Sequence, residues 1–324
     1  MHENKFLEIK HLKKYFSTPK GTLHAVDDIN FEINQGETLG LVGESGCGKS
    51  TTGRLLLRLL NATSGEVLFK GHDIMKFNHR QMKDLRKKAQ IVFQDPYASL
   101  NPRYTISESI MEPLIVNKAY KRVSDVNKRV VQLMDTVGLA RRLINAYPHE
   151  LDGGRRQRVG VARALALQPE FIVLDEPVSA LDVSIQAQIL NLLDELQTEL
   201  NLTYLFISHN LSVVKHVSKR IAVMYLGQIV EMADCKTLFK EPLHPYTKAL
   251  ISAIPIAKVD VKNKRIILKG DVPNPIEPPE GCRFFDRCMY GKDICSKKTP
   301  ELKKVGPGRQ VACYLYEDMR GIEE

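Results

Sequence analysis

The pattern of apolar and polar positions changes period several times along the chain. Residues 5–40 carry short apolar runs separated by turns, in FLEIKHLKKYF and AVDDINFEINQGETLGLVG, and this pattern predicts strands, several of them antiparallel. The spacing becomes helical over 49–60 and over most of 95–165. Over 165–235 strand-like and helical runs alternate, which is typical of a parallel sheet with helices on both faces. We therefore predict an α/β fold.

A second region begins near residue 240. Residues 241–281 are rich in proline and lysine and show no periodicity, which predicts a linker or an extended arm. We expect two domains, residues 1–240 and residues 241–324, in line with a length of 324 residues. No apolar run reaches the roughly 18 to 20 residues that a membrane span needs. The start, MHENKFLEIK, has no apolar signal core, so we expect a cytosolic protein.

A glycine-rich motif follows the predicted strand TLGLV. The letters GESGCGKS at 43–50 fit the pattern G-x-x-x-x-G-K-S, and the helical run TTGRLLLRLL comes next. In such a loop backbone N–H groups surround phosphates, the lysine contacts the β- and γ-phosphates, and the serine binds magnesium. The candidate ATP-binding residues here are Gly43, Ser45, Gly46, Cys47, Gly48, Lys49, Ser50 and Thr51.

Two carboxylates end the apolar strand FIVLDE. Ligands bind at the carboxyl ends of strands in open α/β sheets. We therefore expect Asp175 to hold magnesium and Glu176 to act as the general base that polarises the attacking water. A strand that ends in Asp-Glu is common, but it is much more specific when a phosphate loop precedes it.

The succession of motifs indicates a family. Gln94 ends the strand AQIVFQ, LDGGRRQR occupies 151–158, SALD occupies 179–182, and His209 ends TYLFISH. In this order the chain resembles the nucleotide-binding subunit of an ABC transporter over residues 5–240. That resemblance implies a P-loop NTPase cassette with a RecA-like parallel core, an antiparallel β subdomain, a helical subdomain at about 95–165 and a small Cys-rich C-terminal extension.

The resemblance also assigns roles. It implies a head-to-tail dimer in which each ATP lies between one subunit's phosphate loop and its partner's signature motif. It places Gln94 at the magnesium and at the transmembrane contact, and His209 at the γ-phosphate. Asp182 would lie in the loop that crosses the interface. Phe16, or as second choice Tyr15, would stack on adenine, unless the aromatic belongs to the core. The signature residues are Leu151, Asp152, Gly153, Gly154 and Arg155.

Further stretches narrow the resemblance to the peptide/nickel subfamily of importers. They are FQDPYASLNPR at 93–103, YPHEL at 147–151, HPYTKALISAIP at 244–255 and GDVPNPIEPPEGCRF at 270–284. The resemblance implies an ATPase subunit for di- or oligopeptide import, peripheral on the cytoplasmic face. Its implied partners are permease subunits, a paralogous ATPase and, indirectly, an extracytoplasmic solute-binding protein.

The net charge of +9 indicates an anionic partner without choosing among nucleotide, nucleic acid and lipid. The alternative function is therefore a soluble ABC ATPase that acts on nucleic acid or ribosomes. Members of that class carry two cassettes or a long coiled coil. Here one cassette is present, and Ser50 and Leu151 are separated by about a hundred residues without sustained heptads. We therefore expect no nucleic-acid partner.

The signature departs from the usual LSGGQ, because Asp152 replaces the serine whose hydroxyl donates to the γ-phosphate. A carboxylate only accepts hydrogen bonds and repels phosphate, by roughly 4 kcal/mol per unit charge pair at ~4 Å. Arg155 would offset part of this charge, and Asp152 would also serve as a helix N-cap. We hypothesise that the composite site formed by this signature hydrolyses ATP poorly, which makes a productive homodimer doubtful.

Four of the six cysteines lie in one C-terminal stretch with the spacing C-x5-C-x6-C-x17-C: Cys282, Cys288, Cys295 and Cys313. Four thiolates suit zinc or an iron–sulfur cluster. The wide spacing lacks the paired C-x2-C of zinc ribbons, and the resemblance to peptide importers implies a [4Fe–4S] cluster. Zinc, or no metal, remains an alternative.

Overall fold

The computed structural model describes residues 5–255, 265–270 and 273–319, which form two compact units. Unit 1 takes its residues from Met1–Asn34, Thr38–Lys76 and Ser208–Glu324, and unit 2 from Gln35–Glu37 and Phe77–Ile207. These units divide the chain at other positions than the domain boundaries expected from the sequence, which stay a prediction.

One sheet of unit 1 is antiparallel, as the alternating N-terminal pattern predicts. Its strand order is β2-β1-β4-β5, and the first two strands pair over most of their length. Leu7, Ile9 and Leu12 of the first strand are buried, so this sheet has an apolar inner face. The strands are β1 (Lys5–Thr18), β2 (Gly21–Asn34), β4 (Ser64–Phe69) and β5 (His72–Asp73).

The other strands of unit 1 follow the order β11-β12-β10-β9-β3, in which β3 and β9 are parallel and the remaining neighbours antiparallel. All five residues of β3 are buried, as expected for a strand covered on both faces. These strands are β3 (Thr38–Val42), β9 (Arg220–Tyr225), β10 (Gln228–Asp234), β11 (Lys303–Gly306) and β12 (Arg309–Val311). The α-helices of unit 1 are α1 (Lys49–Leu56), α8 (Leu211–Val217), α9 (Cys235–Lys240), α10 (Pro245–Ser252) and α11 (Asp293–Lys297), and its 3₁₀ turns are η1 (Ile74–Lys76), η4 (Phe285–Arg287) and η5 (Tyr314–Met319).

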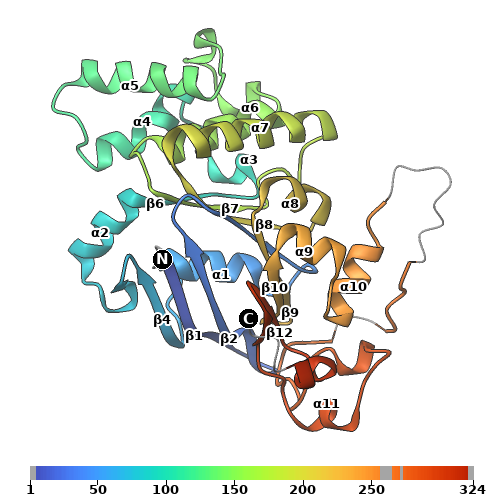
Figure 1. The fold of residues 1–324 in the computed structure, drawn as a ribbon. Helices are drawn as coiled ribbons and strands as arrows, with labels where there is room; N and C mark the ends of the chain where they lie inside the picture. The colour runs from blue at the N-terminus through green and yellow to red at the C-terminus, as the bar shows by residue number, and fades with distance from the viewer. Residues whose placement is uncertain (1–4, 256–264, 271–272, 320–324) are drawn as a thin grey trace. The chain divides into compact units, whose positions relative to one another are not determined.

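Unit 2 combines parallel strands with helices, as the alternation of periods predicts. β7 pairs in parallel with β6 on one side and with β8 on the other. α4, α5 and α6 pack on one another, and α6 also contacts α7 (Figure 1). The strands are β6 (Ala89–Val92), β7 (Phe171–Asp175) and β8 (Thr203–Ser208). The helices are α2 (His79–Lys88), α3 (Pro96–Ser99), α4 (Ile106–Val116), α5 (Val123–Thr136), α6 (Gly153–Leu165) and α7 (Val183–Leu200), with 3₁₀ turns η2 (Arg141–Leu143) and η3 (Pro148–Glu150).

The prediction of a linker or extended arm over 241–281 is wrong for its first part, because α10 lies there. The His244 side chain accepts the Tyr246 N–H at 3.1 Å and caps the helix, and Pro245 takes the first helical position, which suits its fixed φ. Tyr246 is fully buried. Tertiary burial therefore forms a helix too short to show periodicity. Residues 256–264 and 271–272 of the predicted arm lie outside the described residues.

Candidate functional site

The loop at 43–50 joins β3 to α1 in unit 1, where the sequence predicts a phosphate-binding turn. Gly43 has φ 156°, and a Cβ atom there would lie 2.1 Å from the Met224 carbonyl oxygen. Gly48 caps α1 with a left-handed backbone at φ 104°. The close approach of β9 and the positive φ values thus require glycine at these two positions.

Lys49 is held inside this loop. Its side chain is 4% exposed, and its Nζ donates to the carbonyl oxygens of Gly43 at 2.8 Å and Glu44 at 2.9 Å. Burial raises the pKa of the neighbouring Cys47 thiol, although the Lys49 ammonium opposes the shift. A buried neutral thiol packs against the loop and is a poor nucleophile. Ser50 and Thr51 follow in the first turn of α1.

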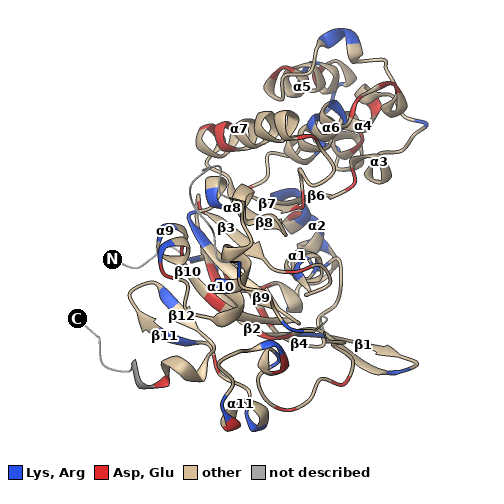
Figure 2. Ribbon diagram, turned by 90° about the vertical axis from the view of Figure 1, so that its right-hand side faces the viewer, with Lys and Arg blue, Asp and Glu red and all other residues tan. Residues whose placement is uncertain are grey.

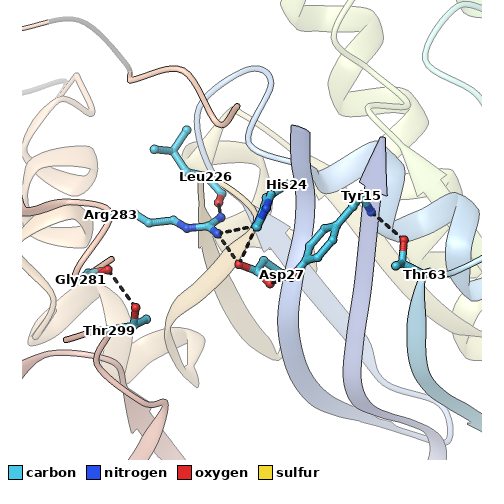
Figure 3. A network of polar contacts seen from close by, with 8 residues as sticks. All are labelled: Tyr15, His24, Asp27, Thr63, Leu226, Gly281, Arg283 and Thr299. Carbon is cyan, nitrogen blue, oxygen red and sulfur yellow. Dashed lines mark hydrogen bonds and ion pairs between the residues drawn. The ribbon is translucent and has the colours of Figure 1, made fainter. Parts of the chain in front are cut away.

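The two aromatic candidates for adenine stacking lie on β1 and are both partly exposed, so neither belongs to the core. The Lys14 ammonium lies 4.7 Å from the centroid of the Phe16 ring. Tyr15 instead stacks on His24, with centroids 4.0 Å apart and planes at 22°, and its hydroxyl donates to Asp27 (Figure 3). The Tyr15 ring is therefore already stacked, whereas the sequence favoured Phe16. The adenine residue stays a prediction.

The strand-end carboxylates and Gln94 meet in unit 2. The Gln94 Nε2 donates to the Glu176 Oε2 at 3.1 Å, and Asp175 is buried at the end of β7. Glu176 has a positive φ of 48°, and its N–H donates to the Ile207 carbonyl at 3.0 Å. A left-handed non-glycine backbone costs free energy and is frequent at functional sites.

The signature residues form the start of α6 in unit 2. Asp152 is the N-cap, and its carboxylate accepts the Arg155 N–H at 2.7 Å and pairs with the Arg155 Nε at 3.4 Å. A Cβ on Gly154 would lie 2.5 Å from the Ile185 side chain, so glycine permits close packing on α7. Leu151 is buried, whereas Asp152 and Arg155 are exposed. Both local roles considered for Asp152 and Arg155 are thus observed.

Two further predicted residues follow strands or begin helices. Asp182 is the N-cap of α7 and accepts the Ile185 N–H at 3.0 Å and the Ser184 hydroxyl at 2.8 Å, and these hydrogen bonds lower its pKa. His209 is exposed and directly follows β8. His209 belongs to unit 1 with the phosphate loop, whereas Gln94, Glu176 and the signature belong to unit 2.

The four C-terminal cysteines gather in unit 1. Burial raises the pKa of Cys282 to about 12, and charges on the other three thiols add to the shift. Interactions between the thiols are also found for Cys288 with Cys295 and for Cys313 with both. The thiols of Cys282, Cys288 and Cys313 each accept a backbone N–H from two residues further along.

This gathering does not make a recognisable metal site. Across the described ranges, no group of three or more His, Cys, Asp or Glu side chains is arranged to hold a metal ion. The structure therefore does not support the predicted cluster. Helix α11 of this segment carries both acidic and basic residues (Figure 2), with Asp293 in its first turn and Lys297 in its last.

Comparisons with known proteins agree with these motifs. The family described as ABC transporter matches residues 26–179, and the family described as oligopeptide/dipeptide transporter, C-terminal region, matches residues 230–295. The chain is 50% identical to the oligopeptide transport ATP-binding protein AppF of Bacillus subtilis, over 97% of this chain and 98% of the relative. The chain belongs to the oligopeptide/dipeptide class of ABC ATPases.

Other relatives and solved structures of ABC proteins extend this result. The ATPase is 52% identical to OppF of Bacillus subtilis, over 95% of this chain and 96% of that protein. It resembles the dimeric cassette MJ0796 bound to ADP and Pi, with a TM-score of 0.65 and 28% identity over 71% of this chain and 98% of that one. Its likeness to CbiO1 of Clostridium perfringens has a TM-score of 0.66 and 28% identity, over 74% and 92% of the two chains. Among the described helices of the ATPase, none is long and apolar enough to cross a membrane.

The sequence reasoning missed several residues that support the phosphate loop of the ATPase. The guanidinium of Arg287 pairs with the Glu44 carboxylate, and the Tyr246 hydroxyl accepts the Glu44 N–H. Arg283 pairs with Asp27 of β2 (Figure 3). Tyr246 lies in the stretch HPYTKALISAIP and Arg283 in GDVPNPIEPPEGCRF, whereas Arg287 lies three residues beyond the second stretch, and no local spacing pairs these residues with Glu44 or Asp27.

Proposed function

We propose that the chain hydrolyses ATP to energise the import of di- or oligopeptides. The observation that carries the proposal is full-length similarity to oligopeptide transport ATP-binding proteins, combined with a phosphate loop whose Lys49 is held among its carbonyls. Membership of this family implies permease subunits as partners. We place the chain at the cytoplasmic face, with a paralogous ATPase and, indirectly, an extracytoplasmic solute-binding protein. The nucleic-acid alternative finds no support in these relatives.

The proposed roles at ATP divide into phosphate contacts, magnesium ligands and a general base. Lys49 would exchange its carbonyl partners for the β- and γ-phosphates, and His209 would contact the γ-phosphate. Ser50, Asp175 and Gln94 would hold magnesium, and Glu176 would accept the proton of the attacking water. The hydrogen bond from Gln94 orients the Glu176 carboxylate while it waits for that water. Magnesium stabilises the charge on the phosphates when it is bound.

The two ATP sites of the dimer are proposed to differ. A site that uses this chain's Lys49 and Glu176 would face the partner's signature and hydrolyse ATP. The other site would face Asp152, whose carboxylate cannot donate to the γ-phosphate and whose Arg155 partner is exposed. The partner is therefore expected to be a paralogue with its own signature.

Hydrolysis in the assembled transporter tests this proposal. Peptide-stimulated ATP hydrolysis and peptide uptake are measured in vesicles with wild type, Glu176→Gln, and the matching change in the paralogue. We expect Glu176→Gln to abolish both activities and the paralogue's change to have a much smaller effect. An equal loss from both changes would contradict the asymmetry. The control is Glu199→Gln, an exposed glutamate on α7 that should leave hydrolysis intact. Hydrolysis without any peptide uptake would contradict the transport function.

For the C-terminal cysteines we propose a [4Fe–4S] cluster, with Zn²⁺ as the alternative ligand. The support for this proposal is the presence of four cysteines in one short segment, because four thiolates suit either group. The proposed effect of the group is to fix a segment that has little apolar core of its own. Cys282, Cys288, Cys295 and Cys313 would be its ligands.

Anaerobic purification distinguishes the alternatives. About four irons and four sulfides per chain, with a broad band near 400 nm that disappears in Cys282→Ser, would support the cluster. One zinc per chain and no visible absorption would contradict the cluster and support a structural zinc ion instead. A chain with neither metal would refute both. Cys235→Ser is the control, because Cys235 is a buried cysteine of α9 outside the four-cysteine segment.

A further inference from the structure

The second residue of the phosphate loop carries the same sign of charge as the phosphates that such a loop binds. Glu44 puts a carboxylate into a loop whose backbone N–H groups and lysine are suited to anions. Its side chain is 27% exposed, so solvent reaches it only in part. An unpaired carboxylate here would repel a triphosphate and leave ATP binding weaker.

Arg287 neutralises this carboxylate. Its Nη1 donates to the Glu44 Oε2 at 2.9 Å and its Nη2 to the Oε1 at 3.3 Å, which is the two-pronged geometry of strong Arg–carboxylate pairs. The Arg287 side chain is only 8% exposed and also reaches the Tyr225 hydroxyl at 3.5 Å. Burial alone would lower the pKa of Arg287, but the bonds to Glu44 and Tyr225 raise it above its ordinary value, so the guanidinium stays charged.

Tyr246 holds the backbone of the same residue. Its hydroxyl accepts the Glu44 N–H at 2.9 Å, although 202 residues separate the two positions. The Tyr246 ring is fully buried and packs 4.6 Å from Tyr225 and 5.5 Å from Phe284, measured between ring centroids. A buried aromatic on a capped helix has little freedom, so it presents its hydroxyl to the loop at a fixed place.

The segment that carries Arg287 is itself anchored. Arg283, four residues earlier, donates to the Leu226 carbonyl and to the Asp27 carboxylate, and its side chain is 6% exposed (Figure 3). Between the two arginines, Phe284 is buried in the aromatic cluster. These contacts fix the position of the turn η4, and they therefore hold Arg287 next to Glu44.

We propose that Arg287 and Tyr246 are positioning residues for ATP, which fix Glu44 from the side chain and from the backbone and so set the affinity of the phosphate loop. The proposal rests on the proposed role of residues 43–51 in binding the phosphates. It gives the C-terminal region, matched as a family over 230–295, a direct part in nucleotide binding.

The decisive experiment compares single and double variants of one ion pair. ATP affinity is measured on the purified full-length chain with wild type, Arg287→Gln, Glu44→Gln and the double variant, and KM and kcat are measured in the assembled transporter. We expect Arg287→Gln to raise the Kd and KM for ATP about three- to tenfold, with kcat within about twofold. Glu44→Gln breaks the same pair but leaves no unpaired carboxylate, so it should raise the Kd and KM less than Arg287→Gln does. The double variant should bind ATP as tightly as Glu44→Gln, because it also has no unpaired carboxylate.

Conservative and matched variants separate positioning from general stability. Arg287→Lys keeps the charge and should lose less affinity than Arg287→Gln. Arg141→Gln breaks an exposed two-pronged pair, in which the Arg141 Nε and Nη2 donate to Asp135 at 3.1 and 2.7 Å, and should not change the KM. Tyr246→Phe removes only the hydroxyl and should raise the KM about twofold. Tyr204→Phe, which removes a buried hydroxyl that donates to the Leu193 carbonyl, should leave it unchanged.

Two outcomes would overturn the proposal. One is an unchanged KM in Arg287→Gln with a lower melting temperature, which would make the pair a scaffold contact. The other is a double variant that binds ATP as weakly as Arg287→Gln, which would exclude charge as the cause. The variant Lys49→Ala tests separately whether residues 43–51 bind the phosphates. If ATP affinity is unchanged in Lys49→Ala, these residues do not bind the phosphates, and the proposed function fails rather than the role of Arg287 and Tyr246.

Discussion

The phosphate loop and the C-terminal region differ in how far along the chain their contacts reach. Lys49 bonds to carbonyls five and six residues before it, and the loop closes on itself. Tyr246 and Arg287 instead reach Glu44 across 202 and 243 residues. The lysine proposed to bind the phosphates is thus supplied by a local motif, while Glu44 of the same motif is held by long-range contacts.

The two regions also differ in what their structure depends on: the backbone conformation of glycines in the loop, and the burial of aromatic side chains in the C-terminal region. The loop adopts positive φ values at Gly43, Gly46 and Gly48, which few other residues tolerate. The C-terminal region gains stability from the burial of Tyr246, Phe284 and Tyr225 in one aromatic cluster. A change in the loop should therefore affect chemistry before stability, and a change in the cluster should do the reverse.

Lys49→Ala is expected to show the largest difference between an effect on ATP hydrolysis and an effect on stability. Loss of the ammonium removes the charge that the phosphates meet, and we expect hydrolysis to fall about 100- to 1,000-fold. The melting temperature should shift by less than about 4 °C, because the change removes two hydrogen bonds to carbonyl oxygens, a weak one to the Cys47 sulfur and little apolar burial. Hydrolysis by the transporter and calorimetry of the purified chain measure both. A large loss of stability in Lys49→Ala would contradict the claim that changes in the loop affect chemistry before stability.

Phe284→Ala should do the opposite. Phe284 is 1% exposed and contacts three aromatic rings, so its loss should cost about 3 kcal/mol in the free energy of unfolding. Hydrolysis per folded molecule should keep its kcat, since no group near the phosphates is removed. Denaturant titration followed by kinetics at low temperature checks this expectation. The matched control is Phe239→Ala on α9, whose ring lies 5.0 Å from the Lys215 ammonium and is less buried. An equal loss of stability in Phe284→Ala and Phe239→Ala would show that the aromatic cluster contributes no more to stability than an ordinary, less buried aromatic side chain.

The same contrast explains what the sequence could predict. The strands, the loop and the helix after it were predictable because apolar periodicity and glycine spacing act over a few residues, as at Gly43 and Gly48. The proximity of Gln94 and Glu176 was predictable because each residue lies within two positions of the carboxyl end of one of two neighbouring parallel strands, β6 and β7. Helix α10 was missed because its eight residues are set by the burial of Tyr246 and by the cap at His244.

The contacts of Arg287 and Arg283 could not be predicted from one sequence. Their partners Glu44 and Asp27 lie 243 and 256 residues away, and nothing in local spacing pairs them. For the four cysteines the sequence instead predicts a site that the structure does not show. Their spacing indicates a metal, but whether the thiols can bind one together depends on the fold around them, and the described residues form no group that could hold a metal.

A pH titration sharpens the comparison by an effect specific to the C-terminal region. Burial, and then the Lys248 charge, lower the pKa of His244 from 6.5 to about 3. Between these values the unfolded chain binds the proton and the folded chain does not, so stability is complete above pH 6.5 and falls as the pH drops. From pH 7 to pH 5 the His244 contribution should fall by about 2 kcal/mol.

The variant His244→Asn isolates this contribution, because asparagine also caps helices but does not titrate. Glu231 accepts the His244 N–H at 2.9 Å, and its pKa is raised by burial, so it opposes the trend. The difference in slope between wild type and His244→Asn is therefore the quantity to measure, by urea denaturation at several pH values. His216→Asn, an exposed histidine on α8, is the control. Identical slopes for wild type and His244→Asn would contradict a buried neutral imidazole.

The smallest expected effect belongs to Asp152, where a local motif has a structural part of its own. Asp152→Ser keeps a good N-cap for α6 and loses an exposed pair with Arg155 at 3.4 Å, so unfolding should change by less than about 1 kcal/mol. The serine would regain a hydroxyl donor for the partner's γ-phosphate, and hydrolysis by the transporter should rise by up to about twofold as the second site becomes active. Asp152→Asn removes the charge but supplies no hydroxyl, and it should raise hydrolysis less. Unchanged hydrolysis in Asp152→Ser would mean that the carboxylate acts only as a cap, and that Asp152 does not cause the proposed difference between the two ATP sites.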